Sequence, residues 1–175
     1  PLRRAVVACP RPSAPVVGGA ALFAAAPQHT LVGVKRLLGR KFLSDGAWLD
    51  SAEGGGLLAC PLVPGEEEGA VRLEMKFERV NSQLRKRGEP PRVVSDKDNK
   101  PRGPIEKRLA PEEVLHRLLA RVRERAAAAL GTEPTHAVLT VPAHWGLAAR
   151  RATADAALLA GLSVLGVVSG ACALL

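Results

Sequence analysis

Four basic side chains gather within seven positions, Lys35 and Arg36 followed by Arg40 and Lys41. A cation placed beside a phosphate can stabilise the charge that spreads over phosphoryl oxygens during transfer. Hydrophobic residues at positions 31, 34, 37 and 38 recur at helical spacing, so Lys35 and Arg36 are expected on or beside a short helix that Gly39 ends. Taken alone, however, the cluster favours a solvated helix face.

A second pair of candidates lies about a hundred residues further along the chain. Pro142 follows the apolar segment 136–141, and Arg150 stands eight residues after Pro142. Read from the residues alone, Pro142 is a strand terminator and Arg150 is a surface arginine on a helix. Neither interpretation requires chemistry, so both residues need further support.

Other catalytic constellations are weak. The histidines are scattered without metal-ligand spacing, and the serines lie in no nucleophile-elbow pattern. The glycine run at 54–56 lacks the Lys-Ser/Thr of a P-loop and indicates a flexible loop. Cys9, Cys60 and Cys172 are odd in number and widely spaced, which argues against a disulfide framework or a cysteine-based zinc site. We therefore predict no metal site, and reduced thiols in a cytosol-like compartment.

The composition sets broad limits. The 175 residues suffice for one domain or two small lobes, and 47% are hydrophobic, but many of these are alanine and only 3% are aromatic, so a thin core is expected. The net charge of +8 admits a nucleic-acid partner. The basic residues are interleaved with acidic ones, and the sequence shows neither zinc-finger spacing nor a strand rich in aromatic residues that could stack on bases. We therefore predict that nucleic acid is not a partner. No apolar run reaches transmembrane length, which predicts no membrane partner.

The elements that must position these candidates follow from local patterns. Val71–Phe77 alternates apolar and polar residues and predicts a half-buried strand. Pro111, the acids after it and Gly131 predict the two ends of a helix with one apolar stripe from Val114 to Ala126. Further elements are expected as strands at 5–9, 136–141 (buried) and 163–168 and as helices at 20–26 and 147–160.

The remaining stretches lack such patterns. Residues 10–16 are expected to form a turn-rich connection and residues 44–70 a loop-like segment. Residues 81–108 are highly charged and rich in proline, with few apolar side chains to offset the entropy of ordering, so a long flexible insertion is predicted. The order of helices and strands predicts an α/β fold in which helices pack on a sheet.

Two blocks of sequence carry a resemblance to a known family. The first is Thr-Leu-Val-Gly-Val-Lys-Arg-Leu-Leu-Gly-Arg-Lys-Phe at 30–42. The second is His-Ala-Val-Leu-Thr-Val-Pro-Ala-His-Trp at 136–145, continued by Arg-Arg-Ala-Thr-Ala-Asp-Ala-Ala-Leu-Leu-Ala-Gly-Leu at 150–162. Together they resemble the nucleotide-binding domain of the Hsp70 chaperones, an actin-like ATPase, over roughly residues 16–43 and 109–170.

The resemblance implies roles for individual residues. Lys35 matches the lysine that reaches the γ-phosphate and the attacking water, so it is the implied catalytic residue. Pro142 and Arg150 match a proline and an arginine that relay nucleotide state to the substrate-binding domain. His144 and Trp145 stand where aromatic residues are usual, and packing is the expected role for both.

The departures from the family pattern are equally specific. Gly170 stands where the family has a glutamate near the catalytic magnesium and water, so it marks a degenerate position. The family's first phosphate loop would precede residue 1, and its second phosphate loop and adenosine motif would follow residue 175. The cofactor-binding residues stay unknown, and the missing initiator methionine suggests a fragment or a partial gene model.

The sequence therefore predicts part of the first lobe of an actin-like ATPase, with residues 1–43 and 109–175 as its core and 44–108 as a loop-rich, insertion-bearing segment. The resemblance implies a chaperone of the stress response that uses ATP and Mg²⁺, with unfolded clients, J-domain co-chaperones and nucleotide-exchange factors as partners. The expected compartment is the cytoplasm, with an organelle lumen as the alternative. Whether this chain is itself an enzyme stays open. A non-catalytic actin-like regulatory domain is the second interpretation, and a basic nucleic-acid module is the third.

Overall fold

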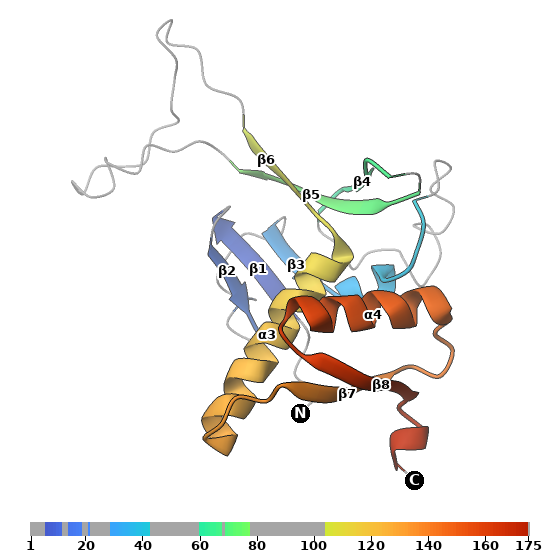
Figure 1. Ribbon diagram of the computed structural model, residues 1–175. Coiled ribbons are helices and arrows are strands. Elements are labelled where there is room, and N and C mark those ends of the chain that lie inside the picture. The colour runs from blue at the N-terminus through green and yellow to red at the C-terminus, as the bar shows by residue number, and fades with distance from the viewer. Residues whose placement is uncertain are drawn as a thin grey trace, which may run out of the picture.

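The computed structural model describes residues 6–11, 14–18, 21, 29–42, 60–67, 69–77 and 104–174 (Figure 1). Within these ranges the chain forms three small sheets, two long helices and short 3-10 turns. The mixture of helices packed on sheets confirms the predicted α/β class. None of the helices in these ranges is long and apolar enough to cross a membrane.

The first sheet is antiparallel and has the order β2-β1-β3. Its strands are β1 (Val6–Arg11), β2 (Ala14–Val17) and β3 (Thr30–Val32). The predicted strand at 5–9 corresponds to β1, but the prediction of a turn-rich connection up to residue 16 was wrong, because the strand β2 begins at Ala14 and pairs antiparallel with β1. The helix predicted at 20–26 lies outside the described residues except for Ala21, which is helical.

The segment that carries Lys35 divides into two elements. Leu31 pairs with Val7 in the sheet, and only Val34–Leu37 forms a helix, the 3-10 turn η2. The prediction of one helix from Leu31 onward was therefore wrong at its start, because sheet pairing overrides the helical spacing. Lys35 and Arg36 do lie on the short helix, and the turn after it ends at Gly39, whose φ of 67° is left-handed.

The second sheet is also antiparallel, with β5 between β4 and β6. The strand β5 (Val71–Phe77) confirms the predicted alternating strand. Two corrections concern its neighbours. The short strand β4 (Leu62–Pro64) interrupts the predicted loop, and β6 (Ile105–Leu109) begins inside the predicted flexible insertion. Residues 81–103, the rest of that insertion, lie outside the described residues.

The helix α3 (Pro111–Leu130) begins and ends where the sequence predicted. Its first turn carries two acids at the positive end of the helix dipole, and the left-handed Gly131 donates its amide to the Ala127 carbonyl at 2.9 Å. The apolar stripe is covered only in its first half. Val114 and Leu115 are buried, whereas Val122 is 59% exposed.

The third sheet is the parallel pair β7 (His136–Val141) and β8 (Ser163–Ser169), joined through α4 (Leu147–Leu159). Pro142 follows β7 directly, as predicted, and a short 3-10 turn, η3 (Cys172–Leu174), follows β8. The prediction that residues 136–141 are buried was wrong, since Val138 is 56% exposed. Parallel strands are normally covered on both faces, and here α4 is the long helix that packs on this pair (Figure 1).

Two clusters of buried side chains hold the elements together. The larger joins β1, β3, β5, η2 and α3, and its largest fully buried members include Leu31, Leu37, Leu73 and Met75. The smaller packs Leu38, which follows η2, against α3 and α4. The helix α4 therefore lies between the β7–β8 pair and the rest of the molecule (Figure 1).

Candidate functional site

Lys35 extends from η2 into solvent while its neighbours anchor the turn. Val34 and Leu37 are buried on the other side of η2, and the Lys35 carbonyl accepts the Leu38 amide at 3.3 Å. Within the described residues the Lys35 ammonium makes no hydrogen bond or ion pair. Its charge is therefore available to an anion, because no carboxylate in the described part of the chain neutralises it.

Arg150 joins the segment after β7 to strand β8. Its Nε donates to the Trp145 carbonyl at 3.0 Å, and its Nη1 donates to the Val167 carbonyl at 3.4 Å. Pro142 begins the same segment, and its carbonyl accepts the Trp145 amide at 3.1 Å. The guanidinium thus holds the connector Pro142–Gly146 against β8. These two carbonyl acceptors define a positioning role, which the earlier interpretation of Arg150 as a surface arginine did not include.

Gly170 extends the parallel pair by one hydrogen bond. Its amide donates to the Val141 carbonyl at 2.9 Å. A side chain at this position would have room, because a Cβ added to Gly170 would meet only the Val141 oxygen, at 3.9 Å. Beside it, the Ser169 hydroxyl donates to the Cys172 sulfur at 3.0 Å and accepts the Cys172 amide.

The structure brings three of the four predicted residues together. Pro142, Arg150 and Gly170 gather where β7 and β8 end, and ligands of open α/β sheets bind at the carboxyl ends of their strands. Lys35 lies on η2, and no hydrogen bond or ion pair links it to the other three. Its connection to them runs through the backbone after η2, where Leu38 packs against α4.

The side chain of Gly170 offers no ligand to a magnesium ion at this end. Magnesium prefers carboxylate and other oxygen ligands, and Gly170 offers none from its side chain. Among the described residues, no group of three or more His, Cys, Asp or Glu side chains could hold a metal ion. The cation that could face a phosphoryl group is Lys35, which lies apart on η2, is exposed, and has no ion-pair partner in the described part of the chain.

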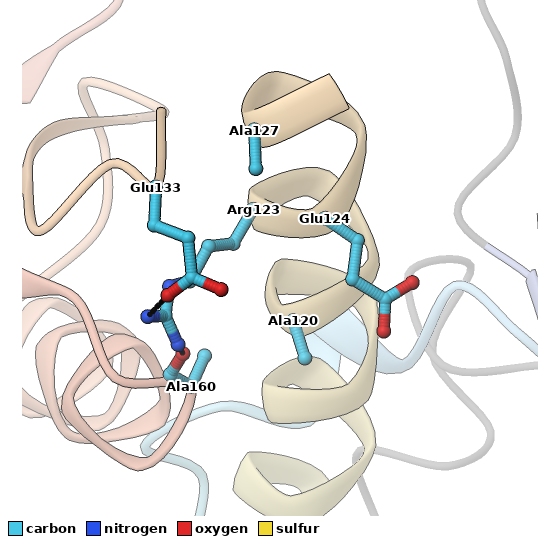
Figure 2. A pocket seen from close by; sticks show the side chains of 6 residues that line it. All are labelled: Ala120, Arg123, Glu124, Ala127, Glu133 and Ala160. Atoms are coloured by element: carbon cyan, nitrogen blue, oxygen red, sulfur yellow. Dashed lines mark hydrogen bonds and ion pairs between the residues drawn. The ribbon is translucent and has the colours of Figure 1, made fainter. Parts of the chain in front are cut away.

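A small pocket lies apart from the predicted residues, between α3, the connection from α3 to β7, and the end of α4 (Figure 2). Its volume is about 120 Å³, and it is lined by Ala120, Arg123, Glu124, Ala127, Glu133 and Ala160. Arg123 is already engaged, because it donates to Glu133 at 2.8 Å and to the carbonyls of Pro134 and Ala160.

The three cysteines occupy different surroundings. Burial raises the pKa of the Cys60 thiol to about 11. It also raises the pKa of Cys9, against the opposing charge of Arg117, whose Nη1 lies 4.0 Å from the sulfur. Cys172 is exposed, and all three thiols are free.

Comparison with known proteins decides the family. A model of the family described as "Hsp70 protein" matches residues 72–174, which include β5 apart from its first residue, α3 and the whole β7–α4–β8 unit. The chain belongs to the Hsp70 family. This confirms the resemblance identified in the sequence, and it makes the α/β elements a fragment of the Hsp70 actin-like ATPase fold.

Alignments with individual Hsp70 relatives show how much of the length of a family member this chain covers. The heat shock 70 kDa protein BIP3 of Oryza sativa subsp. japonica is 50% identical over 80 residues, 42% of this chain and 12% of that protein. Heat shock 70 kDa proteins of Emericella nidulans and Trichophyton rubrum are each 32% identical, over 148 and 143 residues. Both alignments take in 82% of this chain and therefore span Lys35, but only 17% of either protein. The chain thus spans less than a fifth of the length of these relatives.

Proposed function

We propose that the chain forms part of the first lobe of an Hsp70 nucleotide-binding domain, whose ATP binding and hydrolysis drive protein folding in the complete protein. The core of the lobe comprises residues 1–43 and 109–175, with buried side chains added by β5 from the segment 44–108. The observation that carries the proposal is the convergence of Pro142, Arg150 and Gly170 where β7 and β8 end, within the part of the chain that matches the family model.

Lys35 is proposed as the catalytic lysine. Its ammonium is exposed and has no ion-pair partner among the described residues, which supports this role, because such a cation stabilises charge on the oxygens of a transferring phosphoryl group. Pro142 and Arg150 are proposed as the relay to the substrate-binding domain. Arg150 supports that role by tying the connector after Pro142 to β8, so that movement of either one displaces the other.

The 175 residues by themselves are proposed not to turn over ATP. An actin-like site closes around its nucleotide from two lobes, and one lysine supplies neither a phosphate cradle nor magnesium ligands. Magnesium-dependent turnover by the 175-residue chain, lost in Lys35→Ala, would contradict this part of the proposal.

A second candidate function is a non-catalytic actin-like regulatory or interaction domain. The observation that favours it is Gly170, which removes the carboxylate at the end of β8. The complete gene distinguishes the two functions. The family's first phosphate loop has the sequence Asp-Leu-Gly-Thr-Thr, and its second is rich in glycine. If the complete gene encodes the first loop upstream and the second downstream, nucleotide binding is favoured, and absence of both favours the interaction domain.

Partners and compartment follow from the family as further proposals. Unfolded clients, J-domain co-chaperones and nucleotide-exchange factors are the expected partners, in the cytoplasm or in an organelle lumen. Nucleic-acid binding is not proposed. Several basic side chains are already paired, including Arg108 with Glu74 and Arg121 with Glu124. A steep salt dependence of nucleic-acid affinity would overturn this view.

The decisive experiment is calorimetric titration of Mg-ATP into the protein expressed from the complete gene. Lys35→Ala should lower the single-turnover hydrolysis rate by about a hundredfold or more while ATP still binds. Lys41→Ala is the matched control, because Lys41 is an exposed lysine of the same cluster, and it should leave the rate unchanged. Absence of any ATP binding would favour the interaction domain instead.

A further inference from the structure

The backbone at Gly39 lies directly against the first turn of α4. A Cβ added to Gly39 would stand 2.6 Å from the Ala148 carbonyl carbon and 2.8 Å from the Ala149 Cα, and it would also overlap the Ala149 nitrogen. All three atoms belong to the backbone, so no side chain can turn aside to make room. Glycine is required here by this contact as well as by its left-handed φ of 67°.

The contact joins the two parts of the candidate site. On one side, Gly39 follows the turn whose Lys35 carbonyl accepts the Leu38 amide, and Leu38 is itself buried against α4. On the other side, Ala149 precedes Arg150, which bonds the Trp145 and Val167 carbonyls. Every link between Lys35 and strand β8 is thus a backbone bond, a close contact or a hydrogen bond.

We propose that Gly39 is a positioning residue. It fixes the spacing between the turn that carries Lys35 and the first turn of α4, which carries Arg150 and follows the connector Pro142–Gly146. We infer that this spacing couples a phosphate bound at Lys35 to the relay residues Pro142 and Arg150, and this part of the inference rests on the proposed function. The spacing itself is a property of the fold. A packed contact of backbone on backbone transmits displacement because neither side can yield without moving its whole element.

The test compares Gly39→Ala with Gly131→Ala in the protein expressed from the complete gene. The two glycines have similar left-handed φ values, 67° and 73°, but a Cβ at Gly131 would meet nothing within 4 Å. Both variants therefore carry the same backbone strain, and only Gly39→Ala forces two elements apart. The readout is amide hydrogen exchange of the peptide 146–153 under native conditions, without ligand.

Exchange at 146–153 should accelerate by about tenfold or more in Gly39→Ala and stay within about twofold of wild type in Gly131→Ala. The variants are compared at equal distances below their melting temperatures, so that a general loss of stability does not move the readout. Equal exchange in the two variants would overturn the proposal.

If Gly39→Ala does not fold, hydrogen exchange of the wild-type protein tests the proposal instead. Exchange in increasing denaturant should then show residues 38–41 and 148–151 opening as one cooperative unit, and separate opening contradicts the proposal.

A parallel measurement with Mg-ATP separates this inference from the proposed function. If wild type binds ATP and the nucleotide slows exchange at 146–153, Gly39→Ala should lose most of that protection while its affinity changes by less than about threefold. Full retention of the protection would contradict the coupling. If wild type binds no ATP, the proposed function fails, and the ligand-free comparison still decides the role of Gly39.

Discussion

The strands β5 and β7 are both rich in apolar residues but differ in how deeply these residues are buried. On β5, the side chains of Val71, Leu73, Met75 and Phe77 are each at most 5% exposed. On β7, Val138 is 56% exposed, and Leu165 on the neighbouring β8 is 69% exposed. β5 lies between two strands and contributes to the large cluster shared with β1 and α3, whereas the β7–β8 pair packs mainly on α4 and contributes no residue to that cluster.

The comparison separates the framework of the molecule from its candidate site. The β5 region supplies the packed framework on which η2 and α3 rest. The candidate site lies at the end of the half-covered pair, where Gly170 and Arg150 bond to backbone carbonyls. Sites that must open and close are drawn from the less stable parts of a fold. We therefore expect substitutions in the two regions to separate stability from activity.

The largest effect should come from the framework. Leu73 is fully buried, so Leu73→Ala should lower the free energy of unfolding by about 2–5 kcal/mol through lost burial and a new cavity. Val138→Ala is the control from the other region, and it should change stability by no more than about 0.5 kcal/mol. Chemical denaturation measures both, and similar losses in the two variants would show that β7 is covered after all.

The second effect depends on pH. Burial raises the pKa of the Cys60 thiol to about 11, from the 9.0 of an ordinary thiol. The unfolded thiol therefore loses its proton first, and stability should fall between pH 9 and pH 11 by about 1.4 kcal/mol per pH unit. Below pH 9 the contribution is fully present. Cys60→Ala should remove the Cys60 part of this slope in denaturation curves and leave any part due to Cys9, whose pKa burial also raises, whereas substitution of the exposed Cys172 should leave the slope unchanged.

The smallest effect concerns the outer face of β5. A hydrogen bond to Glu106 and the charge of Glu74 raise the pKa of Lys76, whose ammonium lies 3.3 Å and 3.4 Å from these carboxylates. Glu106→Gln should therefore lower the Lys76 pKa toward its ordinary value, as followed by NMR of the lysine side chain. Glu133→Gln, far along the chain beside Arg123, should leave the Lys76 pKa unchanged.

Elements with local signals could be predicted from the sequence. The helix α3 carries its own start and stop in Pro111, the acids that follow and Gly131, and β5 carries strict alternation. The strand β6 could not be predicted, because its pairing depends on charges of a distant strand. Glu74 faces Arg108 and Lys76 faces Glu106 across the ladder. The burial of β7 could not be predicted either, since it depends on what covers the sheet.

The candidate site was predictable to a similar degree. Pro142, Arg150 and Gly170 could be singled out in the sequence only through the resemblance to the Hsp70 family, which covers the segment that holds all three. The two carbonyls that hold Arg150 could not, since one of them belongs to another strand. Gly39 was predicted only as a helix stop. Its contact with α4 joins residues more than a hundred positions apart, and no local pattern records it.

The most direct test of the proposed nucleotide site is Gly170→Glu in the protein expressed from the complete gene. The added carboxylate has room beside the Val141 carbonyl, and a group that positions water and metal is typically worth on the order of a hundredfold in rate. Single-turnover ATP hydrolysis should rise toward that extent while ATP affinity stays within about threefold. Ala171→Glu, which places the same charge one residue away, should not raise the rate. An unchanged rate in Gly170→Glu, with ATP still bound, would contradict the account.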